Sequence, residues 1–210
     1  MKELIAEYNK KKASIKKRLA EFKRIYRKSD EAVFAELAFC LFTPQSKAVS
    51  CDKALRELKD SELLLKGNER DISKILRGLV RFHNKKSSYL VTARGIFKKG
   101  KRCAIKSRLD GKSGRQMREW LVKNVKGLGY KEASHFLRNI GFGGGLAILD
   151  VHILKNLKNF GVIEKIPSSM SKKQYLDIEE RMSGFCASCG IPMPEIDLLF
   201  WSGQTGFIFK

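Results

Sequence analysis

Apolar residues recur at helical spacing along most of this 210-residue chain, and runs that alternate apolar and polar positions are nearly absent. In residues 1–29 the apolar positions form one stripe, and lysines occupy the other faces. This spacing predicts an amphipathic helix that packs by one side. The stripe comprises Leu4, Ile5, Tyr8, Ile15, Leu19, Phe22 and Ile25.

Residues 31–42, EAVFAELAFCLF, are apolar on every side, which predicts a fully buried helix. Ser29 and Asp30 just before this run are residue types that begin helices. The Thr43–Pro44 pair predicts the end of the helix, because the residue before a proline avoids the α-helical region. Further helical segments are predicted within 46–58, 68–79, 83–100, 113–124, 131–141, 146–161, 171–190 and 193–210.

The strongest break in composition is the glycine-rich run 141–145, which is a candidate hinge. We therefore predict an all-α fold of two helical lobes. Residues 29–140 form the central lobe, and residues 1–28 plus 141–210 form the second. Ligand sites favour the junction between lobes, so we expect an active-site cleft there.

The chain carries 43 lysine and arginine residues against 22 aspartate and glutamate residues, a formal net charge of +21. This imbalance indicates a polyanionic partner, foremost nucleic acid. An anionic membrane fits less well, because no apolar run approaches the ~20 residues of a membrane span. Residues 1–23 lack the apolar centre of a signal peptide, so we expect a cytoplasmic protein.

Five cysteines do not form an even disulfide framework, and buried or free thiols are the simplest interpretation. Cys186 and Cys189 have the spacing of a metal-binding pair, but no second pair completes a four-ligand site. We expect neither a metal nor any other cofactor.

Residues 125–129, VKGLG, join two predicted helices in a helix–hairpin–helix pattern. Gly127 and Gly129 allow the turn angles and the close approach of a phosphate. The first amides of the second helix favour an anion, so the motif can hold a DNA backbone without reading sequence. The alternative is an ordinary turn between two packed helices.

Lys131 lies in the first turn of that second helix, where the positive helix end and basic neighbours disfavour a charged amine. A neutral lysine amine is a nucleophile, whereas the alternative is one more surface charge. Asp150 supplies a carboxylate, although an aspartate here also caps the following helix. His152 is either a DNA contact or a packed, hydrogen-bonded histidine.

Together these motifs resemble the endonuclease III superfamily of DNA glycosylases, and most closely its archaeal-type 8-oxoguanine DNA glycosylase/AP lyase branch. The resemblance covers most of the chain. It departs at Lys126, where the family often has proline, and in the absence of the iron–sulfur cysteines of other members. The matching segments are VKGLGYKEASHFLRNIG (125–141), LDVH (149–152), AFCLFTPQSKAV (38–49), VRFHNKKSSYLV (80–91) and IDLLFWSGQTGFIFK (196–210).

The resemblance implies that Lys131 attacks C1′ of the damaged nucleotide, with help from Asp150, and then nicks the strand by β-elimination. It implies that Gln45 fills the gap left by the extruded nucleotide. Backbone contacts are expected from a further set of residues, each of which is otherwise a solvated charge or a turn residue. They are Lys47, Lys85, Lys86, Lys126, Gly127, Gly129 and His152.

The base pocket implied by the resemblance uses Phe82 and Trp201 as stacking faces. The C-terminal carboxylate of Lys210 would accept a hydrogen bond from N7–H, which 8-oxoguanine has and guanine lacks. Trp201 could instead pack in the core. The apolar residues before Lys210 are expected to hold the tail in place.

We thus predict a monomeric 8-oxoguanine DNA glycosylase and AP lyase that acts on double-stranded DNA. Three alternatives remain open. They are a glycosylase of the same superfamily with another lesion, a non-catalytic helix–hairpin–helix module and an RNA-binding protein. The charge alone fits all of them.

Overall fold

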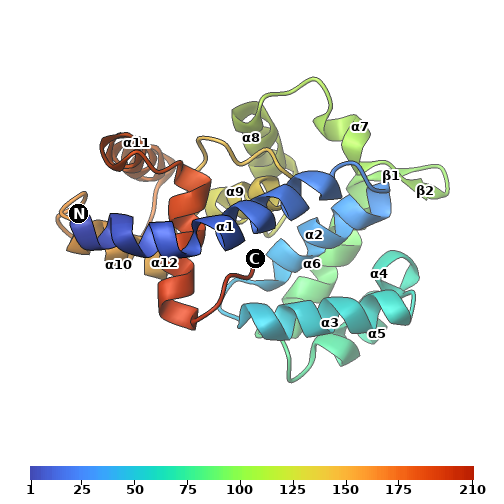
Figure 1. Cartoon of the computed structure of the whole chain (residues 1–210). Coiled ribbons are helices and arrows are strands. Elements are labelled where there is room, and N and C mark those ends of the chain that lie inside the picture. The colour runs from blue at the N-terminus through green and yellow to red at the C-terminus, as the bar shows by residue number, and fades with distance from the viewer.

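The computed structural model describes the backbone of residues 1–210 and every side chain except those of Gln204 and Thr205. Helices dominate the fold, as predicted, and the described residues contain one small β-hairpin (Figure 1). The helices are α1 (Lys2–Ile25), α2 (Asp30–Phe42), α3 (Ala48–Asp60), α4 (Leu63–Lys66), α5 (Glu69–Leu76), α6 (His83–Ile96), α7 (Ile105–Leu109), α8 (Gly114–Asn124), α9 (Tyr130–Asn139), α10 (Val151–Asn159), α11 (Lys172–Cys189) and α12 (Met193–Thr205).

Helix α2 is the buried centre of the fold, which confirms the prediction made from its apolar sequence. All residues from Val33 to Phe42 are buried. The Ser29 hydroxyl accepts a hydrogen bond from the Ala32 amide at the start of the helix, and the cap at the other end is Thr43. A helix with no polar face has to be covered by others, and α3, α6, α7 and α9 pack around it.

Helix α1 brings the start of the chain against its end. It crosses α12 and also contacts α9 (Figure 1). Its buried residues, Leu4, Tyr8, Ile15 and Phe22, belong to the predicted stripe, whereas Ile5 is exposed at its edge. The Tyr8 hydroxyl donates a 2.5 Å hydrogen bond to Glu195 on α12, so a buried polar contact adds to the apolar packing.

The prediction was wrong between residues 97 and 103. Helix α6 ends at Ile96 rather than at Gly100, and β1 (Lys98–Lys99) pairs antiparallel with β2 (Arg102–Cys103). Gly100 has a φ of 61°, which suits the turn of a hairpin and not the continuation of a helix. The short helices α4 and α7 were not predicted, because four or five residues carry too little periodicity.

Buried apolar side chains form two clusters that meet near the glycine-rich run. The first cluster draws on residues 33–146, and the second on α1 and residues 147–200. These bounds support the division into lobes 29–140 and 1–28 plus 141–210, which stays a prediction. Helix α9 belongs to the first cluster and ends where the connection to the second begins.

Two buried ion pairs join helices of the two clusters. Arg118 on α8 makes two bonds, of 2.5 and 2.8 Å, to Glu179 on α11. On α9, Arg138 lies 2.9 Å from Asp197 of α12, an approach too oblique for a hydrogen bond. Removing one partner of such a pair leaves an uncompensated buried charge, so both pairs fix the relative placement of these helices.

Candidate active site

The helix–hairpin–helix consists of α8, the turn at 125–129 and α9. Gly127 has a φ of 93°, and a Cβ there would lie 2.4 Å from the Tyr89 ring. Glycine is therefore required both by the backbone angle and by the neighbouring aromatic ring. Lys126 extends over that ring, with its ammonium 5.9 Å from the ring centroid. The predicted turn is present, and it presents a lysine and a bare backbone at the surface.

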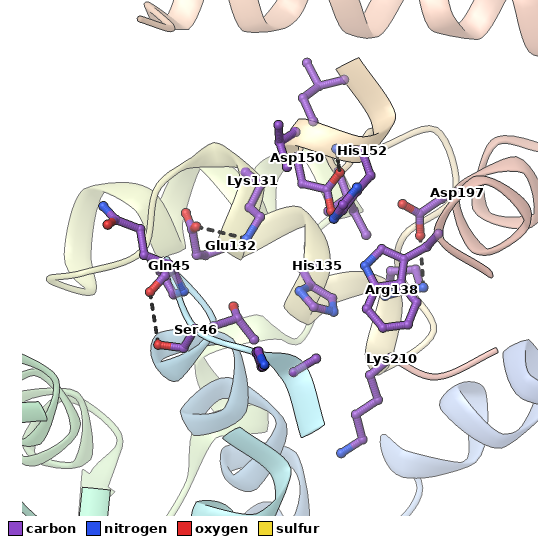
Figure 2. Close-up of a pocket in the computed structure, with 18 of the residues that line it drawn as sticks. Gln45, Ser46, Lys131, Glu132, His135, Arg138, Asp150, His152, Asp197 and Lys210 are labelled. Atoms are coloured by element: carbon purple, nitrogen blue, oxygen red, sulfur yellow. Dashed lines mark hydrogen bonds and ion pairs between the residues drawn. The ribbon is translucent and has the colours of Figure 1, made fainter. Parts of the chain in front are cut away.

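A pocket of about 990 Å³ opens beside the first turn of α9 (Figure 2). Its walls come from the loop between α2 and α3, helix α9, the segment just before α10, and α12 with the tail that follows it. The pocket brings together seven of the residues singled out in the sequence. They are Lys131, Asp150, Gln45, Lys47, His152, Trp201 and Lys210.

Lys131 is the second residue of α9, and a quarter of its side chain is exposed. Its ammonium lies 3.3 Å from the carboxylate of Glu132, which also accepts a 3.2 Å hydrogen bond from the Gly129 amide. Glu132 thus neutralises the helix end where a phosphate was expected. The sequence analysis missed Glu132, although a glutamate three residues after a helix cap is a recognised local signal.

Asp150 performs the capping role and faces the pocket as well. Its Oδ1 accepts hydrogen bonds from the amides of His152 and Ile153, both at 2.8 Å. Among the described side chains no hydrogen bond reaches the other oxygen, Oδ2. The cap therefore fixes the carboxylate and leaves one oxygen for the pocket, so the two interpretations of Asp150 are compatible.

Asp197 is a buried carboxyl in the same pocket that the sequence analysis missed. Burial raises its pKa to about 6, the nearby charge of Asp150 acts in the same direction, and Arg138 opposes the shift. A carboxyl with a pKa near neutral can exchange a proton during a reaction. Its sequence context, an aspartate among apolar helix residues, did not reveal that it meets Arg138.

His135 is a second buried group that the sequence analysis missed. Its side chain lines the pocket with its ring edge-on to Phe39, at 5.8 Å between centroids. Burial holds the pKa of His135 well below its ordinary value, and the charges of Arg138, Lys131 and Lys210 act in the same direction. The ring is therefore neutral, and neither of its nitrogens bonds a described side chain, although the backbone of Lys210 lies close enough to oppose the pKa shift. Figure 2 shows it between Lys131 and Lys210.

The tail after α12 returns to the first cluster. The Lys210 ammonium lies 2.9 Å from Glu36 on α2 and 3.4 Å from Asp52 on α3. The Phe209 ring stacks with Trp201 at 6.5 Å between centroids, and Phe209 also packs against the first cluster. Apolar contact and ion pairing together hold the tail at the pocket, as the sequence led us to expect.

Six of the predicted residues lie outside this pocket, among them Lys85 and Lys86. Lys126, Gly127 and Gly129 occupy the hairpin turn, where a DNA backbone could reach them. Phe82, half exposed, lines a separate depression of about 390 Å³, so the structure does not place it in a base pocket with Trp201. Its φ of 57° holds the ring at the start of α6.

The structure also corrects the expectation for Lys86, whose side chain is only 4% exposed. Its ammonium is enclosed by the protein's own oxygen atoms and is not available to a phosphate. Lys85, the next residue along the chain, is exposed and stays a candidate for that contact.

All five cysteines are free thiols, and Cys189 donates a hydrogen bond to the Phe185 carbonyl of its own helix. Within the described residues no group of three or more His, Cys, Asp or Glu side chains is arranged to hold a metal ion. None of the described helices is both long and apolar enough to cross a bilayer.

Comparison with known proteins shows the family to which a chain with this geometry belongs. A family model described as 8-oxoguanine DNA glycosylase matches residues 15–191. The chain belongs to the 8-oxoguanine DNA glycosylase family. A curated member from Fusobacterium nucleatum, named 8-oxoguanine DNA glycosylase/AP lyase, is 43% identical over 205 residues, 97% of this chain and 94% of that protein.

Solved structures of the 8-oxoguanine DNA glycosylase family agree with this assignment. The crystal structure of the Methanocaldococcus jannaschii 8-oxoguanine DNA glycosylase has a TM-score of 0.89 and 35% identity, covering all of this chain and 95% of the other. The crystal structure of the same protein in complex with a 15mer DNA containing 8-oxoguanine has a TM-score of 0.88 and 34% sequence identity. That match covers 99% of each chain. The predicted family and all-α fold are therefore confirmed.

Proposed function

We propose that this protein excises 8-oxoguanine from double-stranded DNA and then cleaves the strand at the resulting site. One observation carries the proposal: Lys131, at the start of the second hairpin helix, shares a pocket with Asp150 in a chain of the 8-oxoguanine DNA glycosylase family. Relatives are named 8-oxoguanine DNA glycosylase/AP lyase, and one was crystallised with DNA containing that lesion.

The glycosylase step begins when the Lys131 amine, in its neutral form, adds to C1′ of the extruded nucleotide. The bond between C1′ and N9 breaks, and the base leaves with the electron pair and takes up a proton. Positive charge develops on the sugar in this step, and Oδ2 of Asp150 is placed to stabilise it. Before this, Glu132 holds the lysine ammonium, and Asp150 could accept its proton.

The lyase step follows from the same bond. Loss of the amine proton and opening of the sugar ring give an imine between Lys131 and C1′. A base then removes a proton from C2′, the C3′–O bond breaks, and the 3′ phosphate leaves. Hydrolysis of the imine releases the lysine, so one side chain serves both activities.

Extrusion of the nucleotide costs a few kcal/mol, and DNA contacts around the pocket must offset it. We assign gap filling to Gln45, whose backbone has a φ of 54° in the loop that borders the pocket. Backbone contacts are assigned to Lys47, Lys126 and His152, and to the bare turn at Gly127 and Gly129. Each contact would increase the affinity for DNA by an amount that does not depend on base sequence and that decreases with salt concentration.

The base is proposed to lie against Trp201 and beside the backbone of Lys210, because both line the pocket that holds Lys131. Phe82 is left out of this base pocket and assigned to the duplex surface, since its ring lines the separate depression. The monomeric state and the cytoplasmic location stay predictions from the sequence.

The proposal is tested by borohydride trapping on duplex DNA with a single 8-oxoguanine. Borohydride reduces the imine, so the wild type should give a covalent protein–DNA adduct, and Lys131→Gln should give none. An undamaged duplex is the control. If Lys131→Gln is trapped as efficiently as the wild type, another amine is the nucleophile and the proposal fails.

The identity of the lesion needs its own comparison. Excision from duplexes that carry 8-oxoguanine, uracil or an oxidised pyrimidine should favour 8-oxoguanine. Faster excision of another base would favour a same-superfamily glycosylase with a different lesion. Tight binding with neither excision nor an adduct would leave only a DNA-binding module.

A further inference from the structure

The buried lysine of α6 is aimed at the loop that carries Gln45. The Lys86 ammonium donates to the carbonyls of Phe42 and Pro44, at 2.7 and 2.6 Å, and lies 3.1 Å from the Ser46 hydroxyl. Phe42 is the last residue of α2, so one of these carbonyls is at the negative end of the helix dipole. A single charged group thus holds both sides of Gln45.

The charge of Lys86 has no acidic partner. No ion pair among the described side chains includes Lys86, and its three bonds go to uncharged oxygens. Burial lowers its pKa to about 8, and the more distant charge of Glu132 acts in the opposite direction. Burying an ammonium without a counter-ion is costly. The placement is better explained by what the ammonium holds.

What it holds is a strained loop. Gln45 has a φ of 54°, a left-handed conformation that is unfavourable for a non-glycine residue and persists only where the surroundings impose it. Ser46 is fixed from a second direction, because its hydroxyl accepts a 3.0 Å hydrogen bond from the Arg81 amide. The residues on either side of Gln45 are therefore anchored, while its side chain borders the pocket.

We propose that Lys86 is a positioning residue that sets the conformation of the 43–46 loop, so that Gln45 can enter the duplex when the lesion is extruded. The inference rests on the proposed function, since it concerns the same reaction. Lys86 touches neither the base nor the sugar, and it acts through Gln45. It is distinct from the Lys131 nucleophile, because its amine is enclosed by three oxygen atoms.

The test is a double-mutant cycle on single-turnover excision of 8-oxoguanine opposite cytosine. Lys86→Met keeps the aliphatic stem and removes the ammonium, and Gln45→Ala removes the side chain that it positions. We expect each single variant to lose on the order of tenfold in rate and the double variant to lose little more, because the two residues act as one unit.

The matched control is Lys85→Met, which removes an exposed charge from the neighbouring position of the same helix. In the double variant Lys85→Met/Gln45→Ala, the fold-losses in excision rate of the two single variants should multiply, because a contact with the DNA backbone is independent of the loop. If the effects of Lys86→Met and Gln45→Ala multiply in the same way, Lys86 does not act through Gln45 and the inference is overturned.

Thermal unfolding of each variant shows whether a lower excision rate comes from a misplaced loop or from a loss of folded protein. If Lys86→Met does not fold, the cycle is run with Lys86→Gln, whose amide can still donate to the loop carbonyls and should recover part of the rate. If Lys86→Gln lowers the excision rate by the same factor in the wild type and in Gln45→Ala, the inference is overturned. If the wild type does not excise 8-oxoguanine, the proposed function itself fails and the role of Lys86 fails with it.

Discussion

At the scale of single residues, the pocket is lined by side chains that have structural roles and to which we also assign chemistry. Asp150 caps α10 with one oxygen and presents the other to the site. Lys131 starts α9 and is paired with Glu132, which also bonds the hairpin backbone. These double roles can be separated by substitutions that keep one function and remove the other.

Asp150→Asn should separate capping from catalysis. Asparagine caps helices about as well as aspartate, so the free energy of unfolding should change little, whereas Asp150→Ala should lose about 1 kcal/mol. Both variants should lose borohydride trapping on 8-oxoguanine DNA, because neither carries a negative charge. Denaturant titration and trapping on the same samples check this. Full trapping by Asp150→Asn would show that the carboxylate acts only as a cap.

Asp197 should impose a pH dependence on stability. Its folded pKa of about 6 lies above its ordinary value of 3.8. Between these values the folded state holds a proton that the unfolded state has released, so stability falls as pH rises from 4 to 6. The loss is at most about 3 kcal/mol. Denaturant titrations of the wild type and Asp197→Asn across this window should diverge, and parallel curves would contradict the assignment.

At the scale of elements, the hairpin turn depends on one glycine. Gly127 lies in the connection between α8 and α9. Tyr89, whose ring it contacts, lies on α6. The second hairpin helix, and with it Lys131, is therefore positioned relative to α6 as well as to α8.

Gly127→Ala should destabilise the protein by roughly 1–3 kcal/mol, through the strained φ of 93° and the clash with Tyr89. It should also weaken DNA binding, since the clash displaces the turn. Gly144→Ala is the matched control, because a Cβ there meets nothing within 4 Å and its φ is unremarkable. Equal melting temperatures for the two variants would refute the close contact at Gly127.

The sequence was most informative where a function depends on neighbours along the chain. Lys131 and Asp150 were singled out from a turn and a cap, and they line the same pocket, while Glu132 had a local signal of the same kind. The surroundings of Asp197, His135 and Lys86 were not predictable, because burial and partners come from segments far apart in the chain. The hairpin of β1 and β2 was missed because the helical spacing of α6 continues in the sequence up to Gly100, where the predicted helix ended.

At the scale of the whole molecule, a net charge of +21 should make DNA binding depend strongly on salt. The logarithm of the affinity should fall linearly with the logarithm of salt concentration, by about 0.9 for each phosphate neutralised. Lys47→Met and Lys126→Met should each lower that slope by about one. Titrations of a labelled duplex over a range of salt concentrations measure it, and an unchanged slope would remove either lysine from the interface.

The two buried ion pairs have a consequence for how damage is located. Arg118 with Glu179 and Arg138 with Asp197 link the two clusters, and losing either partner inside the folded protein would leave an unpaired buried charge. We therefore expect the protein to keep its shape when it binds, so that the double helix has to bend. The work of bending depends on base sequence, even at positions that the protein does not touch. Lesions beside flexible pyrimidine–purine steps should be repaired before those in stiff A-tracts, and competition between two such duplexes would reveal this order.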